Sequence, residues 1–270
     1  MKGCDRMKFS EEKKQAVIRY ILEKITQNDP RVTKTVSEAM GINQNTVHSY
    51  ITELIEAGVI RRPKRGQYEL VQQIYEYRLL RSKGELESDM YAYRHCLAEL
   101  LRDDPQNVRE IWEYAFSEMI NNVMDHSQAS EAYIRVFRDP VSTTVILSDN
   151  GVGIFRKIQQ YFGFESIDEA IGELFKGKLT TDSVNHSGEG IFFSSRMMDE
   201  FLILSDGKVF CINKYEESIL TDMNALASGT CIYMSLSNSS NKKAREIFNR
   251  YADVDNGFTK TNIPLRNIYD

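Results

Sequence analysis

The spacing of apolar residues predicts three helices in the first seventy residues. Each stretch carries apolar side chains three or four positions apart, as one face of a helix requires, over residues 16–25, 36–40 and 47–55. Gly41 predicts a left-handed end to the second helix, and Asn43 predicts the N-cap of the third. Residues 59–71 alternate around a turn at 64–66, so we expect a two-stranded hairpin next.

Residues 72–104 are charged, and we expect a mostly helical connector that ends before Pro105. A stronger helical pattern begins at Val108 and continues to His126, and another short helix is expected over 191–198. Alternating or apolar segments predict strands over residues 132–137, 143–147, 201–204, 209–213 and 229–236. The fold class is therefore α+β, a two-layer α/β sandwich with helices on one face of a mixed, mainly antiparallel sheet, preceded by an all-α or winged-helix domain.

Length and composition narrow the class of protein. A chain of 270 residues suits one or two domains, and no apolar run approaches the ~18 residues of a membrane span. The N-terminus lacks the apolar stretch of a signal peptide, so we expect a cytoplasmic protein without membrane contact. The cysteines lack the paired spacing of a zinc site and fit a reducing compartment: Cys4, Cys96, Cys211 and Cys231.

The net charge of −5 hides a difference between the two ends of the chain. Residues 1–70 hold 13 Lys and Arg against 9 Asp and Glu, a net charge of +4. Residues 71–270 carry the balance, a net charge of −9. A basic module followed by an acidic body suggests two parts with different partners.

Three motifs carry the candidate chemistry of the acidic part. Glu118, Asn122 and His126 are four residues apart, so a helix would place their side chains on one face. The sequence Asp149-Asn-Gly-Val-Gly153 predicts a sharp turn, because glycine adopts conformations that other residues avoid. The sequence Ser187-Gly-Glu-Gly-Ile191 places glycines at a helix start, where backbone amides favour phosphate oxygens.

These residue types suit a nucleotide with a metal on its phosphates. Mg²⁺ prefers oxygen ligands and keeps several waters, so the amide oxygen of Asn122 could bind it without repelling the phosphates. Glu118, one helical turn earlier, could accept a proton from an attacking water or hydroxyl. The carboxylate of Asp149 could accept the amino proton of adenine. Lys176 and Lys178 could close over the phosphates.

Taken singly, each motif also has a structural interpretation, as a solvated helix stripe or a common turn. Their order along the chain is more specific: helix, strand pair, Asp-x-Gly-x-Gly, a loop of about thirty residues, a Gly-x-Gly helix start, then Gly229-Thr230 before a strand. In this order, residues 108–237 resemble the GHKL superfamily, which includes gyrase-type ATPases and the ATP-binding domains of histidine kinases. The run from Ser117 to Ser127 is most similar to the anti-sigma factor serine kinases of that superfamily. The resemblance implies an ATP-binding domain over 105–237.

The resemblance also implies a role for each matching residue. Glu118 would be the catalytic base, Asn122 the magnesium ligand and Asp149 the adenine contact. Residues 154–187 would form a mobile ATP lid, and Thr230 would support Asp149 and adenine through water. The remaining members of the nucleotide site would be Gly151, Gly153, Lys178, Gly188, Gly190 and Ile191.

Two features depart from the family pattern. Glu189 stands between the glycines of the second motif, and a carboxylate beside phosphates is unfavourable unless it points away. His126 stands where the family often has a basic residue, and it either contacts a phosphate or serves as a structural histidine. The alternative function is therefore a transcription factor with a degenerate, non-catalytic nucleotide-binding fold.

Residues 1–71 resemble a winged helix-turn-helix module. The run that carries this resemblance is Val36-Ser-Glu-Ala-Met-Gly-Ile-Asn-Gln-Asn-Thr-Val-His-Ser-Tyr-Ile51, followed by the basic hairpin. The family would place the third helix in the major groove of DNA. Bases would then meet Gln44, Asn45, His48 and Ser49, and phosphates would meet Arg61, Arg62, Lys64 and Arg65. The other interpretation is a solvated basic hairpin on a module that packs against a protein.

The leading hypothesis is an ATP-binding regulatory protein of bacterial type, with ATP and Mg²⁺ as cofactors. Its nucleotide site would control, or be controlled by, the DNA- or protein-binding module, with ATPase or serine/threonine kinase activity left open. Residues 238–270 are expected to be a polar tail. Similar arrangements often continue into a STAS-like domain, so the chain could be truncated and such a domain would be its partner. The oligomeric state stays open, a homodimer included.

Overall fold

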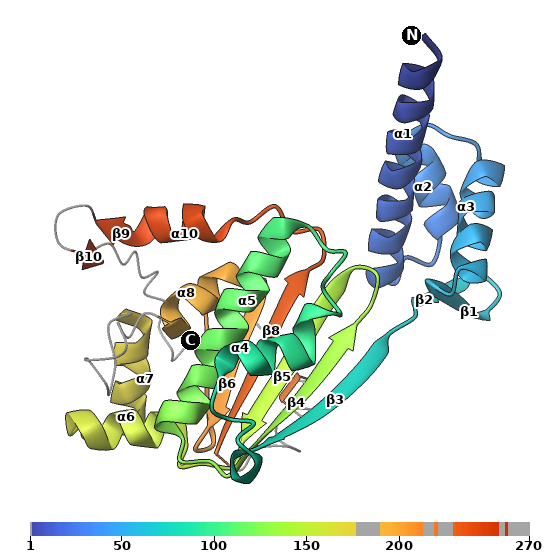
Figure 1. The fold of residues 1–270 in the computed structure, drawn as a ribbon. Helices are drawn as coiled ribbons and strands as arrows, with labels where there is room; N and C mark the ends of the chain where they lie inside the picture. The colour runs from blue at the N-terminus through green and yellow to red at the C-terminus, as the bar shows by residue number, and fades with distance from the viewer. Residues whose placement is uncertain (1, 177–189, 213–218, 221–228, 254–256, 259–270) are drawn as a thin grey trace. The chain divides into compact units, whose positions relative to one another are not determined.

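The computed structural model describes residues 2–176, 190–212, 219–220, 229–253 and 257–258 (Figure 1). The chain divides into two compact units. The first comprises Met1–Gln73 and Arg138–Ser142, and the second comprises Ile74–Phe137 and Thr143–Asp270. Among the described residues, no helix has the length and apolar character needed to cross a membrane.

Residues 2–73 of the first unit contain three helices and a hairpin. These elements are α1 (Lys2–Thr26), α2 (Val32–Met40), α3 (Gln44–Glu56), β1 (Ile60–Lys64) and β2 (Gln67–Leu70). The strands β1 and β2 pair antiparallel. A separate apolar core, which includes Val17, Ile21, Val36, Val47 and Ile51, holds the helices together.

The two predicted helix boundaries in this unit are confirmed. Gly41 has a φ of 60° in the left-handed region, and its N–H donates to the carbonyl of Ser37. The side chain of Asn43 accepts a hydrogen bond from the N–H of Asn45, which is the N-cap arrangement. Gly41 therefore ends α2 and Asn43 begins α3, as the sequence predicts.

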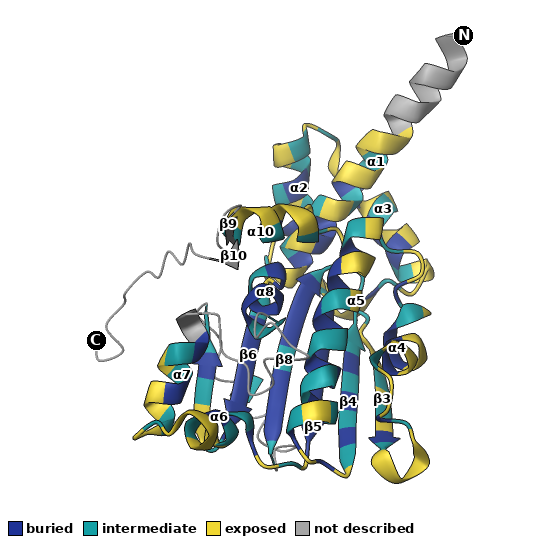
Figure 2. Cartoon of the chain, turned by 60° about the vertical axis from the view of Figure 1, so that its left-hand side comes forward, coloured by how far each residue is buried: buried dark blue, intermediate teal, exposed yellow. Residues whose placement is uncertain are grey.

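The described residues of the second unit are built on a six-stranded sheet with the order β3-β4-β5-β8-β6-β7. The strands are β3 (Gln73–Leu80), β4 (Glu131–Arg138), β5 (Ser142–Asp149), β6 (Glu200–Ser205), β7 (Lys208–Cys211) and β8 (Thr230–Ser237). Strand β6 runs antiparallel to both β7 and β8. The centre of this sheet is almost entirely buried (Figure 2).

Helices cover one face of the sheet (Figure 1). They are α4 (Asp89–Tyr93), α5 (Gln106–Asn121), α6 (Ile154–Phe162), α7 (Ile167–Lys176), α8 (Gly190–Met197) and α10 (Ala244–Tyr251). The described part also has short helical segments, η1 (Arg81–Lys83) and the π-helical η2 (Arg94–Ala98) and η3 (Asn122–His126), and two short strands that pair antiparallel, β9 (Ala252–Asp253) and β10 (Gly257–Phe258). The main core lies between helices and sheet and includes Trp112, Phe116, Val145 and Leu147. The predicted α+β arrangement of helices on a sheet is confirmed.

Two segments of the second unit form elements that the sequence did not predict. Residues 73–80, expected within a helical connector, form the edge strand β3. Residues 244–251, expected within a polar tail, form α10, whose Phe248 packs edge-on against Tyr114 and Phe193 with ring centroids 5.2 and 4.6 Å away. Both segments therefore extend the second unit beyond the range that the motifs suggested.

Candidate functional site

The first motif lies at the C-terminal end of α5. Apolar residues at helical spacing, including Ala115 and Met119, are fully buried and fix the rotation of α5. Glu118 and Asn122 are partly exposed on another face of the same helix. The predicted spacing of these two side chains along an α-helix is therefore correct as far as Asn122.

The expected straight helix does not continue to His126. Residues Asn122–His126 form the π-helical turn η3, in which hydrogen bonds span five residues instead of four. This turn changes the direction of His126 relative to Glu118 and Asn122. The carbonyl of His126 accepts a hydrogen bond of 2.5 Å from Nζ of Lys157 on α6, a contact that the sequence did not reveal.

Glu118 meets the second glycine motif directly. A methyl group built on Gly190 would lie 2.1 Å from Oε2 of Glu118 and 2.9 Å from its Cδ. The carboxylate of Glu118 thus packs against the first residue of α8, and a residue larger than glycine would displace it. Helices α5 and α8 are neighbours along their length, which explains how motifs seventy residues apart meet.

Asp149, at the end of β5, is a buried carboxylate whose side chain receives backbone hydrogen bonds. The residue is 5% exposed, and the N–H of Gly151 donates to its Oδ1 at 2.7 Å. Burial raises the pKa of Asp149 to about 6, while the N–H groups of Gly151 and Thr230 oppose this shift by favouring the charged form. Asp149 is therefore a desolvated acceptor held in one orientation.

The glycine turn after Asp149 needs glycine because the backbone approaches its neighbours closely. A methyl group on Gly151 would lie 2.2 Å from the carbonyl oxygen of Ser127. One on Gly229, whose φ is 132°, would lie 2.6 Å from both the Asp149 carbonyl and the Gly151 nitrogen. Glycine is required at both positions by contact with backbone atoms, which cannot move aside cheaply.

Ser127 joins the first motif to the glycine turn. It follows η3 directly, and its hydroxyl donates to the carbonyl of Val123 at 2.7 Å. Its own carbonyl accepts the N–H of Val152 at 2.9 Å. Asn150 reinforces this junction, because its side-chain oxygen accepts the N–H of Ser130 at 3.0 Å. The helix that carries Asn122 and the turn that follows Asp149 are therefore fixed to each other.

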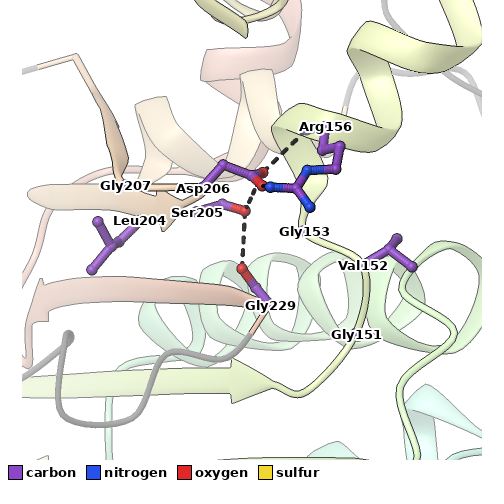
Figure 3. Close-up of a pocket in the computed structure, with 9 residues that line it drawn as sticks. All are labelled: Gly151, Val152, Gly153, Arg156, Leu204, Ser205, Asp206, Gly207 and Gly229. Atoms are coloured by element: carbon purple, nitrogen blue, oxygen red, sulfur yellow. Dashed lines mark hydrogen bonds and ion pairs between the residues drawn. The ribbon is translucent and has the colours of Figure 1, made fainter.

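Thr230 connects Asp149 to α6. Its backbone N–H donates to Asp149, and its hydroxyl accepts the N–H of Ile154 at 3.0 Å. A second connection comes from the turn between β6 and β7, where Asp206 forms an ion pair of 2.9 Å with Arg156 (Figure 3). The Asp-Gly dipeptide at 206–207 is a recognisable hairpin turn in the sequence, but its partner on α6 is not.

A cavity of about 320 Å³ lies between the glycine turn and the turn that joins β6 to β7 (Figure 3). Its walls are Gly151, Val152, Gly153, Arg156, Leu204, Ser205, Asp206, Gly207 and Gly229. Glu118, Asn122 and Asp149 are not among these residues. The cavity therefore adjoins the motif site through the turn and is lined by different side chains.

Several predicted site residues lie outside the described residues. They are Lys178 and Gly188, together with Glu189 and residues 177–187 of the proposed lid. Of the predicted residues that are described, Gly190 begins α8 and Ile191 follows it, partly buried. Residues 154–176 of the proposed lid form α6 and α7.

The donor groups present are compatible with MgATP. Asn122 supplies a neutral amide oxygen and Glu118 a carboxylate on one helix, and Mg²⁺ needs only one or two protein oxygens when phosphates and waters complete its shell. Among the described residues, no group of three or more His, Cys, Asp and Glu side chains could hold a metal ion by itself.

The predicted DNA-contacting side chains of the first unit are all exposed: Gln44, Asn45, His48, Ser49, Arg61, Arg62, Lys64 and Arg65. Arg61 pairs with Glu69 across the hairpin, with 2.7 Å between Nη2 and Oε2. The guanidinium of Arg62 lies 6.0 Å from the ring centre of Tyr68. Arg61 and Arg62 thus already have partners on the hairpin.

Comparison with known protein families gives one match. Residues 107–240 match the family model described as histidine kinase-, DNA gyrase B- and HSP90-like ATPase. The matched range begins at the start of α5 and ends just after β8, so it contains Glu118, Asn122, Asp149 and Thr230. A comparison with curated proteins found no match. The serine-kinase subtype and the winged-helix module stay predictions.

Proposed function

Because residues 107–240 form a GHKL-type ATPase domain, we propose that this protein binds MgATP there and uses the bound nucleotide to regulate its N-terminal unit. The domain itself supports ATP binding and leaves hydrolysis and phosphoryl transfer as the candidate reactions. Asp149 is the observation that carries the proposal. Asp149 is buried, and its Oδ1 accepts a backbone N–H. A carboxylate can accept further hydrogen bonds, so Asp149 could also accept one from a ligand, for example from the amino group of adenine.

The phosphate end of the nucleotide would lie between α5 and the start of α8. Asn122 would hold Mg²⁺, which supplies charge neutralisation at the phosphates when bound. The backbone amides at Gly190 and Ile191 stand at a helix N-terminus, a position that favours phosphate oxygens. Lys178 and Gly188 belong to the same proposal on the basis of sequence alone.

Glu118 is the proposed general base. It lies one helical turn before Asn122 and packs against Gly190, so it is near both the metal ligand and the start of α8. From there its carboxylate would orient an attacking water or hydroxyl and accept its proton. Gly190 leaves room for this carboxylate and keeps it in place. Water would lead to ATP hydrolysis, and a protein hydroxyl would lead to serine or threonine phosphorylation.

The N-terminal unit is proposed as the regulated module. Its exposed third helix and basic hairpin support binding of DNA, with Gln44, Asn45 and His48 facing bases and Arg61, Arg62, Lys64 and Arg65 facing phosphates. The same exposed surface is compatible with a protein partner, such as a STAS-like domain. The net charge of +4 over residues 1–70 favours DNA.

The test is isothermal titration of the full chain with MgATP. We expect saturable binding that Asp149→Asn weakens on the order of tenfold or more, because a lost charge-assisted hydrogen bond costs roughly 1.5–3 kcal/mol. Asp103→Asn, which changes an exposed carboxylate shortly before α5, is the matched control and should bind like the unmodified protein. Absence of binding by the unmodified protein, or equal binding by Asp149→Asn, contradicts the proposal.

Catalysis is tested separately with Glu118→Gln. We expect this variant to bind MgATP but to lose phosphate release and phosphoryl transfer by a factor of about 10²–10⁴. Glu113→Gln, an exposed glutamate on the same helix, should retain full turnover. Full turnover by Glu118→Gln would reject its role as base.

A nucleotide-independent transcription factor is the second candidate. Glu189 between the glycines of the second motif favours it, because a carboxylate there opposes phosphate binding. DNA binding that is unchanged by MgATP, in a protein that gives no heat with the nucleotide, would support this candidate over the first.

A further inference from the structure

The start of α6 receives hydrogen bonds from side chains outside the helix. The N-cap residue is Gly153, which has no side chain to cap the helix. The first backbone N–H groups of a helix have no partner within it and need acceptors from elsewhere. The N–H of Ile154 donates to Thr230 at 3.0 Å, and the N–H of Arg156 donates to Oδ2 of Asp206 at 3.2 Å.

Asp206 is well placed to act as this external cap. It occupies the turn between β6 and β7 with a φ of 53°, in the left-handed region, and its side chain is only 6% exposed. The hydroxyl of Ser205 lies 3.1 Å from Oδ2, and the guanidinium of Arg156 lies 2.9 Å from Oδ1 (Figure 3). A carboxylate at a helix N-terminus is also favoured by the helix dipole.

The same carboxylate touches the glycine turn. A methyl group on Gly153, whose φ is 83°, would lie 2.7 Å from Oδ2 of Asp206 and 2.9 Å from the hydroxyl of Ser205. Asp206 therefore contacts the last residue of the Asp149–Gly153 motif and the first turn of α6 at once.

Part of the space beside the turn is a cavity on this side. The cavity of about 320 Å³ lies between the turn and the β6–β7 hairpin, and Arg156 and Asp206 belong to its walls. Where side chains do not fill the space, hydrogen bonds must fix the backbone. The bond from the Arg156 N–H to Asp206 is one of the bonds that span this gap.

We propose that Asp206 is a positioning residue for nucleotide binding, which caps α6 and so holds the glycine turn beside Asp149 in its binding conformation. This proposal rests on the proposed MgATP site. Asp206 acts through the backbone N–H of Arg156, while the ion pair with the Arg156 side chain is secondary. That guanidinium is 58% exposed, and exposed ion pairs contribute little.

Three variants of the full chain separate the cap from the ion pair. Asp206→Gly removes both interactions and tolerates the positive φ. Asp206→Asn keeps an acceptor oxygen for the N–H, and asparagine also tolerates this φ. Arg156→Ala removes the ion pair and keeps the N–H. MgATP titration and amide hydrogen exchange of residues 154–157 are measured for each variant.

We expect Asp206→Gly to weaken MgATP binding on the order of tenfold, because the free energy lost with a helix cap corresponds to about this change in affinity. The same variant should speed amide exchange at the start of α6. Asp206→Asn should stay within about threefold of the unmodified protein in binding, and Arg156→Ala should leave amide exchange at the start of α6 unchanged. Equal acceleration of this exchange by Arg156→Ala and Asp206→Gly would show that the ion pair acts instead, and unchanged binding by Asp206→Gly would show no positioning role. Either result overturns the proposal.

Two further outcomes keep the inference separate from the function it rests on. If the unmodified protein binds no MgATP, the proposed function fails, and the exchange data alone decide whether Asp206 caps the helix. If Asp206→Gly does not fold, the unmodified protein supplies the test. Its Arg156 amide should then exchange at least tenfold more slowly than an exposed amide, and fast exchange overturns the cap.

Discussion

At the scale of single residues, Asp149 makes the stability of the second unit depend on pH. Its pKa in the folded protein is about 6, above the value of 3.8 expected in an unfolded chain. Between these values the folded state binds more protons than the unfolded state, so stability falls as pH rises. A pKa raised from 3.8 to about 6 changes the free energy of unfolding by at most about 3 kcal/mol over this pH range.

Replacing Asp149 by Asn removes this titration. As pH rises from 4 to 7, we expect the free energy of unfolding of the unmodified protein to fall by up to about 3 kcal/mol relative to that of Asp149→Asn. Most of the change should occur between pH 4 and 6. Urea unfolding followed by fluorescence of Trp112, the single tryptophan and fully buried, measures the difference. A difference between the two proteins that does not vary with pH would refute the raised pKa.

The sequence predicted the residues that carry the candidate chemistry, but it did not predict the contacts that hold them in place. Asp149 and the glycines appear as a motif because chain spacing alone defines the turn. Asp206 and Lys157 contact this region from other elements, and only the folded chain brings them there. Glu118 against Gly190 is a similar case, since the sequence supplied both residues but not their contact.

At the scale of elements, the pattern of apolar residues predicted the buried strands and the edge strand β7, and it missed the other edge strand, β3. The residues of β3 carry charges that look like those of a solvated helix. In the folded protein, Arg78 pairs with Glu131, and Glu76 pairs with Arg135, across the β3–β4 border. These pairs stabilise a sheet edge, and a single sequence does not reveal them. The π-helical turn η3 was missed because its residues fit α-helical spacing equally well.

Helix α10 should contribute to the stability of the second unit. Phe248→Ala removes the ring contacts to Tyr114 and Phe193, and we expect a loss of roughly 2–3 kcal/mol from a partly buried aromatic side chain. Tyr161→Ala, in which a 58% exposed side chain is removed, should cost less than about 1 kcal/mol. Chemical denaturation compares them, and equal effects would mean that α10 contributes nothing specific.

At the scale of the whole molecule, the difference in charge between the two parts of the chain predicts salt-dependent binding of DNA by the first unit. Lys64→Ala/Arg65→Ala should weaken binding at low salt and reduce the slope of log K against log salt by about 2, one for each lost phosphate contact. The control Lys13→Ala/Arg19→Ala removes two exposed positive charges from α1. Fluorescence anisotropy at several salt concentrations tests this, and equal slopes for both double variants would argue against a hairpin contact.

The edge position of β3 bears on any attempt to isolate the ATPase part. Seven core residues precede residue 105, namely Leu79, Leu86, Ala92, Tyr93, Cys96, Leu97 and Leu101. A shortened protein that starts at residue 107 would lose their apolar surface and leave β4 with unpaired N–H and C=O groups along its outer side. An exposed edge strand with unpaired N–H and C=O groups can pair with a strand of another chain, so the fragment would tend to self-associate. Nucleotide affinities measured on a fragment of that kind would describe an aggregate. A fragment that begins near residue 73 retains the edge strand β3.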